Sequence, residues 1–503
     1  MNKVALIALS FLLILNSFIY AVDRKYIPEN ADSVFSFNAF TLAQKGEIDL
    51  QKILNDFFMQ KYADRYLEYR DDEFVAEVMT NKLNDYIDFS NTSRIIFING
   101  YQQMSLIFDV KDIAKLDKLM IKMASQEDKL VSVADNASYR YLALDEYNLI
   151  SWNEEIFSII LKLKDNYWYN EELNKDDITN TANSIFINDT PLKDEKFLAL
   201  ENETNDSYVW VNLSLLSDDN SDFGKFLFGR SYEGISKESY KDAVITAKIN
   251  FDNGYAQAVV DSYAPNYPYD SLLLKKELAD NIYSFADGKN NYGFFSLAFN
   301  SKELSKHIKS IIGDIRNLHF SEELKSLEEN GIDAYKFIEL FKGDIFVSFF
   351  NNYEDNTDEY DSVLIAASIT DADTVKIILE TFAEDSSDDI YTIGGSLVFI
   401  KDSILYISDN PDIIDNIVNG KMPETLLSAE KLELAKNNTM ALYLEFNSNT
   451  SLLGILDEYT DALESAYLTY NILEDNHTQI IFRVNTKDKE KNSLYIIKSL
   501  LGL

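Results

Sequence analysis

The feature that most constrains the fold of this chain is a pattern of strands and helices that occurs twice. Residues 105–112 read as a strand that enters a helix, and residues 365–371 repeat this pattern about 260 residues later. The apolar side chains of the two expected helices have matching spacings: Leu116, Leu119, Met120 and Met123 in the first, and Val375, Ile378, Leu379 and Phe382 in the second. A repeat of this kind predicts two copies of one fold.

The length and the element pattern predict two tandem domains. A chain of 503 residues exceeds what one hydrophobic core usually serves. We expect a signal peptide over 1–21, domain A over 22–286, and domain B, an internal duplicate of A, over 287–503. The polar, glycine-containing run 287–291 is the expected boundary. Because each half mixes hairpins with helices, the predicted class is α+β, each domain being an antiparallel sheet with helices packed on it.

Three hairpins support this organisation. Residues 141–152 and residues 397–407 each read as strand, tight turn and strand, and each is expected to run directly into a helix, at 153–156 and at 409–413. The third hairpin, residues 243–263, turns at an Asn-Gly pair, which is preferred where both turn residues need a positive φ. Its expected counterpart near the end of the chain pairs 479–484 with 494–501. Four further strands end near an asparagine: 34–38, 208–212, 294–300 and 442–447.

The charge and the absence of cysteine exclude several classes of function. The 84 acidic and 46 basic residues give a formal net charge of −38. Such a chain repels phosphate backbones, so we expect no nucleic-acid binding. Without cysteine there is no disulfide, no thiolate metal site, no cysteine nucleophile and no lipid-bearing cysteine.

The first residues resemble an export signal. A short positive region, Met1–Lys3, precedes an apolar run from Val4 to Tyr20, and Ala21 offers a small residue for cleavage. We therefore expect an exported protein, located in the periplasm, at the outer surface or outside the cell. An uncleaved signal would instead serve as an N-terminal anchor. No later segment is long and apolar enough to predict a membrane span.

No motif predicts catalysis, a cofactor or a metal. The three histidines, His307, His319 and His477, lack the spacing of a zinc clamp. The acidic runs 218–222, 354–359 and 384–389 lack the glycine of a calcium loop, so we expect solvated turns with at most weak calcium binding. Neither a Gly-x-Ser-x-Gly elbow nor a dinucleotide fingerprint is present.

The aromatic residues offer one candidate contact surface. We expect Trp152 and Trp210, which lie on alternating strands, to pack in the core rather than to stack on sugars. Tyr167, Trp168 and Tyr169 form an aromatic cluster with polar neighbours, and we predict that these three residues form a partner surface.

Three short segments resemble a family of exported bacterial proteins. Residues 26–34 open the expected mature chain with an Ile-Pro sequence, residues 331–333 lead into a strand at 344–350, and residues 150–153 end a hairpin. Together they resemble the proteins grouped as domain of unknown function 4836 and, more loosely, the group numbered 3352. The resemblance implies an envelope-associated α+β protein of unestablished biochemistry. It implies no catalytic residue, and although members of the first group are often lipoproteins, this chain has no cysteine to carry a lipid.

These observations lead to one expected function and two alternatives. We expect an exported envelope or surface protein that is not an enzyme and that binds a protein or glycan of the cell envelope, on a sheet face or between the domains. One alternative is a hydrolase that uses paired carboxylates, which 84 acidic residues would allow. The other is a carrier that holds an apolar ligand between its sheet and helices.

Overall fold

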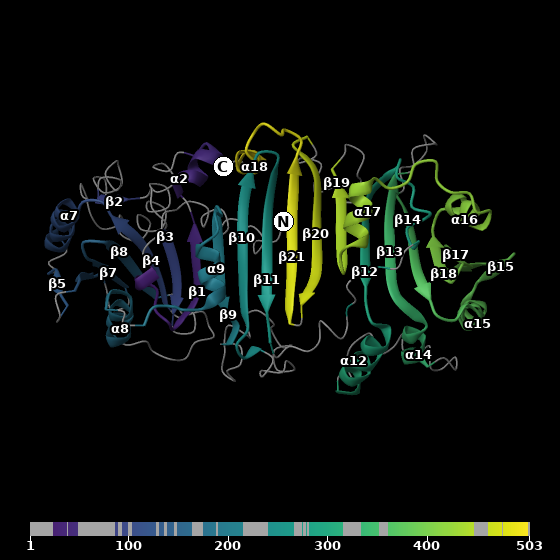
Figure 1. Ribbon diagram of the computed structural model, residues 1–503, viewed down its shortest axis with the longest axis horizontal. Coiled ribbons are helices and arrows are strands. Elements are labelled where there is room, and N and C mark those ends of the chain that lie inside the picture. The colour runs from purple at the N-terminus through teal and green to yellow at the C-terminus, as the bar shows by residue number, and fades with distance from the viewer. Residues whose placement is uncertain are drawn as a thin grey trace. The chain divides into compact units, whose positions relative to one another are not determined.

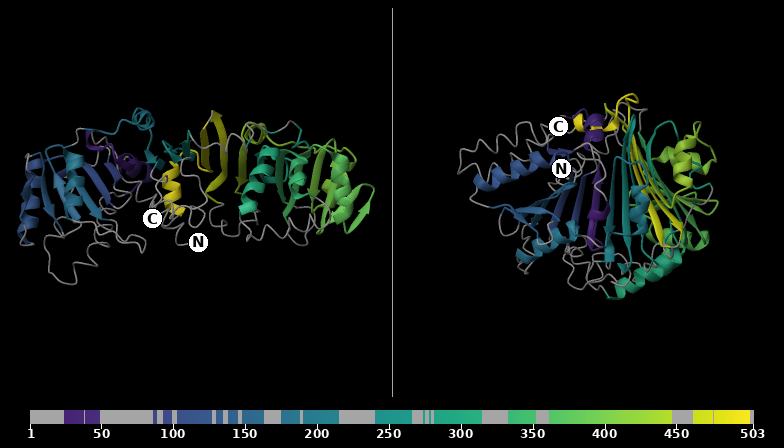
Figure 2. Two further views of the ribbon diagram at one scale, coloured as in Figure 1. Left: turned by 90° about the horizontal axis from the view of Figure 1, so that it is seen from below. Right: turned by 60° about the vertical axis from the view of Figure 1, so that its left-hand side comes forward.

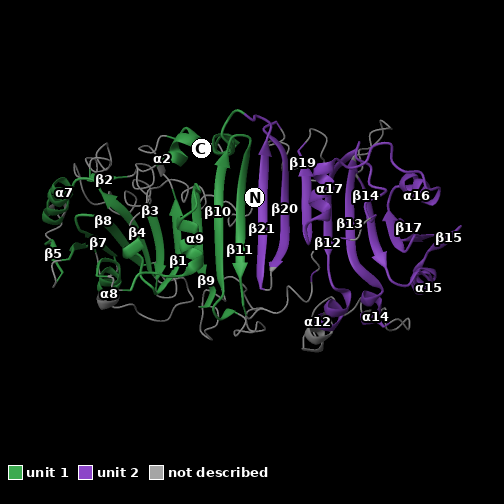
Figure 3. Ribbon diagram, viewed as in Figure 1, with its two compact units in different colours: residues 1–266, 490–503 green, residues 267–489 purple. Residues whose placement is uncertain are grey.

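The computed structural model shows an α+β protein that divides into two compact units (Figures 1 and 3). Unit 1 contains residues 1–266 and 490–503, and unit 2 contains residues 267–489. Each unit is an antiparallel sheet with helices packed on it, which confirms the predicted fold class. The structure describes residues 24–37, 39–48, 86–88, 93–98, 103–126, 130–134, 138–144, 148–162, 175–187, 190–214, 240–265, 274, 278, 281–314, 333–351, 361–446, 461–474 and 476–500.

The sheet of unit 1 has the strand order β5-β6-β7-β8-β4-β3-β1-β9-β10-β11, and each neighbouring pair is antiparallel. The short strand β2 (Ile87–Asp88) pairs with the end of β4. The other strands are β1 (Ala31–Phe37), β3 (Ser93–Ile98), β4 (Gln103–Val110), β5 (Ser132–Val133), β6 (Arg140–Ala143), β7 (Asn148–Trp152), β8 (Ile156–Lys162), β9 (Ser207–Asn212), β10 (Val244–Asp252) and β11 (Tyr255–Tyr263).

The sheet of unit 2 has the strand order β15-β16-β17-β18-β14-β13-β12-β19-β20-β21, again antiparallel throughout. Its strands are β12 (Asn291–Ala298), β13 (Phe341–Asn351), β14 (Asp361–Ile369), β15 (Asp385–Ser387), β16 (Ile390–Ile393), β17 (Ser396–Lys401), β18 (Ile404–Ser408), β19 (Met440–Glu445), β20 (Leu463–Glu474) and β21 (His477–Thr486). Aligned from β5 and from β15, the two orders match strand for strand, which is the arrangement that a duplication predicts.

The alignment of strands corrects one expected equivalence. Residues 153–156 do not begin a helix, because the Asn153 Oδ1 atom accepts hydrogen bonds from the backbone N–H groups of Glu155 and Ile156 at 2.9 and 2.8 Å and closes a turn. The apolar residues that follow form β8, which pairs with β4 and β7. The hairpin β6–β7 therefore corresponds in position to β16–β17, and not to β17–β18.

Helices cover the sheets in the same way in both units. In unit 1, α8 (Lys175–Phe186) and α9 (Glu195–Glu201) pack on one face, and in unit 2 α16 (Pro411–Val418) and α17 (Ala429–Lys436) do so (Figure 1). On the other face, α7 (Ile113–Gln126) and α15 (Ala372–Phe382) pack against the strands at the outer end of each sheet. The remaining described helices are a short 3-10 helix η1 (Arg24–Tyr26), α2 (Ala39–Gly46), α12 (Ser301–Asp314), α14 (Ala334–Glu339) and α18 (Ser493–Leu500).

The core of unit 2 is built from stacked aromatic rings beneath α16 and α17. The ring of Phe294 stacks on those of Phe346 and Tyr443, with ring centres 5.6 and 5.7 Å apart. The small residues Ala366 and Ala441, both buried, occupy the strands beside them. Large and small side chains thus alternate across neighbouring strands, which allows the helices to approach the sheet closely.

The end of the chain differs from the sequence-based expectation. Residues 494–500 form the helix α18 rather than a strand, and the closing hairpin of unit 2 is β20–β21. Two features explain the helix: Leu494 and Ile497 are three residues apart, and the Asn492 Oδ1 atom accepts a hydrogen bond from the Leu494 N–H at 3.0 Å. α18 lies beside α2 (Figure 2), so residues 490–503 belong to unit 1 and the units do not divide at Asp287.

The hairpin β10–β11 forms as expected, but its turn differs in detail. Asn253 and Gly254 connect the strands, and the Gly254 backbone has a φ of 84°. Asn253 is not among the described residues with a positive φ. The glycine is therefore the residue that this turn requires, because only Gly254 adopts the left-handed conformation.

The cap of α15 gives a prediction about pH. Asp371 accepts hydrogen bonds from the Thr374 hydroxyl at 2.6 Å and the Thr374 N–H at 3.1 Å, and these bonds lower the pKa of its carboxyl group below the usual 3.8. Because the folded-state pKa is the lower one, the stabilisation is present above the usual value and is lost as the pH falls through the lowered value. We expect D371N to be less stable than the native chain at pH 7, with the difference shrinking in acid, as urea unfolding at several pH values would show. D373N removes a charge from the same helix turn and is the control; equal pH dependence in both variants would contradict the assignment.

Candidate functional site

The two faces of the unit 2 sheet differ in how deeply their side chains are buried. On the face beneath α16 and α17, side chains such as Phe294, Phe346 and Leu364 are fully buried. The side chains that alternate with them point to the other face and remain partly exposed. We call this second set the apolar face. Across its central strands it consists of Phe295, Leu297, Val347, Phe349, Met440, Leu442, Leu444, Ala466, Leu468, Tyr470, Ile480, Phe482 and Val484.

The hairpin β20–β21 shows that this pattern is unusual for a sheet surface. Its apolar-face residues pair directly across the strands, Leu468 with Phe482 and Tyr470 with Ile480. Phe482 is 46% exposed. The opposite side of the same hairpin carries hydrogen-bonded polar groups, including a bond from the Asn485 Nδ2 atom to the Ser465 hydroxyl at 2.9 Å. When one face of a sheet meets water, that face is ordinarily the polar one.

Unit 1 carries a similar but less aromatic surface at the corresponding strands. Val209 and Val211 on β9 face Ala247 and Ile245 on β10, and Ala247 faces Val260 on β11. All five side chains remain partly exposed. Each unit therefore carries an apolar face on these corresponding strands, and the face of unit 2 includes aromatic side chains such as Phe295 and Phe482.

In unit 1, a buried ion pair fixes a helix over the opposite face. The Arg94 guanidinium on β3, 1% exposed, forms an ion pair with the Glu201 carboxylate at the end of α9, with 2.7 Å between Nη2 and Oε1. Its carbon atom Cζ lies 5.9 Å from the centre of the Phe197 ring. The pair leaves the Arg94 Nε and Nη1 atoms without a hydrogen-bond partner among the described residues. The ion pair therefore joins the end of α9 to the sheet.

In unit 2, an ion pair also joins a helix to the sheet, but its positively charged residue, Lys431, lies on the helix and its carboxylate lies on a strand. The Lys431 ammonium on α17 is 2.8 Å from the Glu445 carboxylate on β19 and donates a hydrogen bond to the Asn291 carbonyl on β12 at 3.0 Å. The Tyr443 hydroxyl donates to the same carboxylate at 3.1 Å. Burial raises the pKa of the Tyr443 phenol well above its usual value, and Glu445 raises it further, so the phenol remains a neutral donor.

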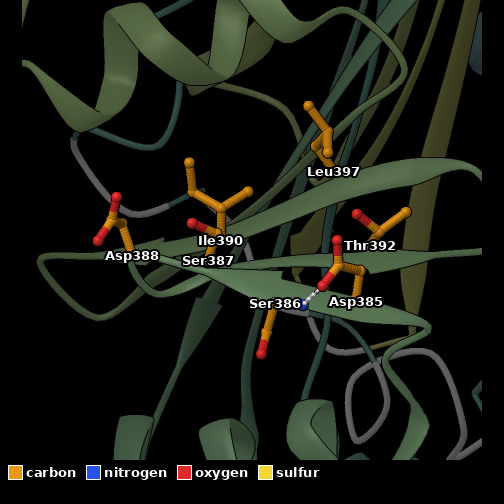
Figure 4. Close-up of a pocket in the computed structure, with 7 residues that line it drawn as sticks. All are labelled: Asp385, Ser386, Ser387, Asp388, Ile390, Thr392 and Leu397. Atoms are coloured by element: carbon orange, nitrogen blue, oxygen red, sulfur yellow. Dashed lines mark hydrogen bonds between the residues drawn. The ribbon is translucent and has the colours of Figure 1, made fainter.

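One shallow hollow lies at the outer end of unit 2, between β15, β16 and β17. It encloses about 220 Å³, and Figure 4 shows Asp385 and Asp388 at its opposite ends. The Asp385 carboxylate accepts a hydrogen bond from the neighbouring Ser386 N–H at 2.8 Å. All three β15 residues are exposed. This geometry is that of a solvated turn, as expected for residues 384–389, and it brings no pair of carboxylates together for acid–base chemistry.

The two described tryptophans pack in the core, as predicted. Trp152 is 0% and Trp210 is 2% exposed. The Trp152 Nε1 atom donates to Asp117 at 2.8 Å, and the Trp210 Nε1 atom donates to Asp194, the cap of α9, at 3.0 Å. Each indole therefore joins the sheet to a helix and presents no face to a ligand.

Several predicted candidates lie outside the described residues. These are the proposed partner surface Tyr167, Trp168 and Tyr169, the histidine His319, and the acidic runs 218–222 and 354–359. His307 lies on α12 and His477 begins β21. Over the part of the chain that the structure describes, no three acidic or histidine side chains gather in a way that could hold a metal ion.

Sequence reasoning did not identify the apolar face. The signal was present in the hairpins, because alternating residues such as Leu468, Tyr470, Ile480 and Phe482 are large and apolar. Alternation predicts that one side of a strand is apolar, but it does not show which side the helices cover. The packing of α16 and α17 supplies that information. Both helices come after β18 in the sequence, and they cover the face of the sheet opposite to the apolar face.

Comparison with known proteins gives one sequence relative and several distant structures. The chain is 69% identical over 148 residues to an uncharacterized protein in the tlyA 5′ region of Brachyspira hyodysenteriae, which covers 29% of this chain and 97% of the relative. Crystal forms I and III of TP0453 match 48% of this chain and 79% and 80% of theirs, with TM-scores of 0.27 and 0.28 and identities of 10% and 8%. Scores this low support no argument. No family model matches the chain. Within the described ranges, no helix has the length and apolar character to cross a membrane.

Proposed function

The chain belongs to the same family as the uncharacterized protein in the tlyA 5′ region of Brachyspira hyodysenteriae, and we propose that it is an exported, non-enzymatic binding module of the cell envelope. We further propose that its contact surface is the apolar face of unit 2. The signal-like run Met1–Ala21 supports export.

The observation that carries this proposal is that the hairpin β20–β21 leaves its apolar side partly exposed, whereas a strand surface that meets water is ordinarily polar. Its polar side chains bond to one another on one side, while Phe482 and its neighbours remain partly exposed on the other. Moving a large apolar side chain from full exposure to full burial is worth about 1.5–3 kcal/mol, and each partly exposed side chain of this face would contribute a part of that. A partner that covers a row of these side chains therefore gains binding free energy from their burial. Contiguous exposed apolar side chains of this kind are typical of interaction surfaces.

The chemistry of the apolar face favours a protein partner over a glycan. A glycan needs hydrogen-bonding groups beside its stacking surface. The pairs Leu442 with Leu468 and Leu444 with Ala466, across β19 and β20 on this face, are aliphatic and supply none. The apolar core of a protein interface is built from such side chains. The net charge of −38 further disfavours a strongly acidic partner.

A photoreactive side chain tests where the partner binds. We expect benzoyl-phenylalanine in place of Phe482, in the full chain in its native cell, to form a covalent adduct with a protein of discrete mass. The physical reason is that Phe482 is the most exposed described side chain of the apolar face. L468D, which places a charge directly opposite Phe482, is expected to remove the adduct. The adducts would be measured by mass spectrometry of the purified chain.

The matched control is the same photoreactive side chain at Ile377. This residue lies on α15 and is 64% exposed, but it is not part of the apolar face. Equal labelling from both positions would mean that the apolar face is not the contact surface. A lipid adduct at residue 482 would support the carrier of an apolar ligand instead of a protein partner.

A further inference from the structure

In unit 2, one buried lysine lies against both a carboxylate and a side-chain amide. Lys431 on α17 is 7% exposed, and Asn291 at the start of β12 is 4% exposed. The Lys431 Nζ atom lies 2.8 Å from the Glu445 Oε1 atom and 3.2 Å from the Asn291 Oδ1 atom. Because Oδ1 is bonded directly to Cγ, a nucleophilic nitrogen lies beside the carbon of an amide group. We call Asn291, Lys431 and Glu445 the lysine triad.

Hydrogen bonds hold the Asn291 amide in one orientation. Its Nδ2 atom donates to the Ser348 hydroxyl at 2.7 Å and to the Gly293 carbonyl at 2.8 Å. The Lys431 Nζ atom also donates to the backbone carbonyl of Asn291 at 3.0 Å. The amide and the amine are therefore held toward each other by bonds on both sides. Holding two reacting groups in this way replaces a slow encounter with an effectively unimolecular step.

The carboxylate of the lysine triad is placed to carry protons. Besides its contact with Lys431, the Glu445 Oε1 atom accepts a hydrogen bond from the Tyr443 hydroxyl at 3.1 Å, which fixes the carboxylate beside the amine. The Lys431 Nζ atom also lies 5.1 Å from the centre of the Tyr443 ring. A carboxylate within hydrogen-bond distance of the nitrogen that it deprotonates meets the geometric condition for a general base. Because Lys431 and Asn291 are buried, water is kept from competing with the amine.

The corresponding positions of unit 1 lack this combination of groups. These positions follow from the shared register shift in β1 and β12, from the third residue after the caps of α9 and α17, and from the pairing of β9 and β19. In place of the three residues of the lysine triad, unit 1 has Ala31, Phe197 and Asn212. Unit 1 therefore builds the same arrangement of strands and helices without the triad, so the fold alone does not require the three groups together.

We propose that the side chains of Lys431 and Asn291 join in a covalent isopeptide bond. Glu445 takes a proton from the Lys431 ammonium, the neutral amine attacks the Asn291 Cγ atom, a new Nζ–Cγ amide bond forms, and the Cγ–Nδ2 bond breaks. Lys431 begins with three protons on Nζ and ends with one, and the two released protons leave with the Nδ2 amino group as one ammonium ion. Glu445 is regenerated as a carboxylate, so the reaction needs no oxidant, reductant or further reactant.

The bond ties the strand β12 to the helix α17. Asn291 and Lys431 are 140 residues apart in the sequence. A covalent link across so long a segment restricts the unfolded chain far more than the folded one, so it stabilises unit 2 mainly through the unfolded state. The proposal does not depend on the function proposed for the apolar face, because the lysine triad lies on the side of the sheet that α17 covers.

Peptide mass spectrometry of the full-length native chain tests the bond directly. We expect trypsin to leave the chain uncut after Lys431 and to release a branched peptide that contains both Lys431 and Asn291. The mass of this peptide is expected to equal that of its two linear parts minus one ammonia. Finding only linear peptides for these two residues would overturn the proposal. A loss of ammonia from the Asn291 peptide without a branch would also overturn it, since an asparagine can lose ammonia by closing on its own backbone.

Two variants separate the reaction from the fold. K431R keeps the positive charge but replaces the nucleophilic amine with a guanidinium, and E445Q keeps a hydrogen-bonding group but removes the proton acceptor. We expect both variants to retain the circular dichroism spectrum of the native chain and to give linear peptides only. A branched peptide from E445Q as abundant as that from the native chain would overturn the role assigned to Glu445. Lys45, which pairs with the buried Asp206 carboxylate at 2.7 Å, is the internal control and is expected in a linear peptide. The native chain decides the outcome even if a variant fails to fold.

Discussion

Replacing Glu201 with alanine is expected to lower the free energy of unfolding by about 3 kcal/mol or more. The change removes the only described ionic partner of the Arg94 guanidinium, which is 1% exposed and already has two nitrogen atoms without a partner among the described residues. The positive charge would then remain buried and uncompensated. Equilibrium unfolding in urea, followed by circular dichroism, would measure the loss.

Replacing the other member of the ion pair, Arg94, with methionine is expected to lower the free energy of unfolding by less. In R94M the apolar side chain fills the buried site, and the remaining Glu201 carboxylate, which is 19% exposed, can be hydrated. E203A is the matched control, because the neighbouring Glu203 pairs with Lys248 near the surface and its loss should cost only about 0–1 kcal/mol. If R94M were as destabilising as E201A, the cost would come from lost packing rather than from the buried charge.

The second large effect is expected for W152A. Trp152 is 0% exposed and donates a hydrogen bond to Asp117, so its removal leaves a cavity at the outer end of the unit 1 sheet. Loss of a buried aromatic side chain of this size typically costs about 3–5 kcal/mol. The same urea unfolding experiment measures it.

A surface substitution provides the comparison for W152A. I377A changes an apolar side chain that is 64% exposed and should alter stability by about 0.5 kcal/mol or less. If W152A unfolded at the same urea concentration as the native chain, Trp152 would not be a core residue, and a role in stacking on a ligand would return to consideration.

Much of the secondary structure could be predicted from local patterns. The helix α16 begins where Asn410 and Pro411 predict it, and the Asn410 side chain accepts the Asp412 N–H at 2.9 Å. β8 could not be predicted, because Asn153 followed by two glutamates has the composition of a helix start. The structure shows that the same asparagine closes a turn instead.

The site depended on information that no local pattern contains. Arg94 and Glu201 are 107 residues apart in the sequence, and nothing near either residue identifies its partner. Likewise, the alternation in β20 and β21 predicts two amphipathic strands, but it does not show which side of the sheet the helices leave uncovered. Long-range packing decides both features, and a single sequence states it only indirectly.

The position of α18 has a consequence for the order in which the protein folds. Leu42 and Phe251 precede unit 2 in the sequence, yet the side chain that covers them, Leu494, follows it. A chain that grows from its N-terminus therefore completes unit 2 before it can complete unit 1. During that interval Leu42 and Phe251 lack the side chain that buries them in the folded protein, and unit 1 depends on the synthesis of unit 2 for its own completion.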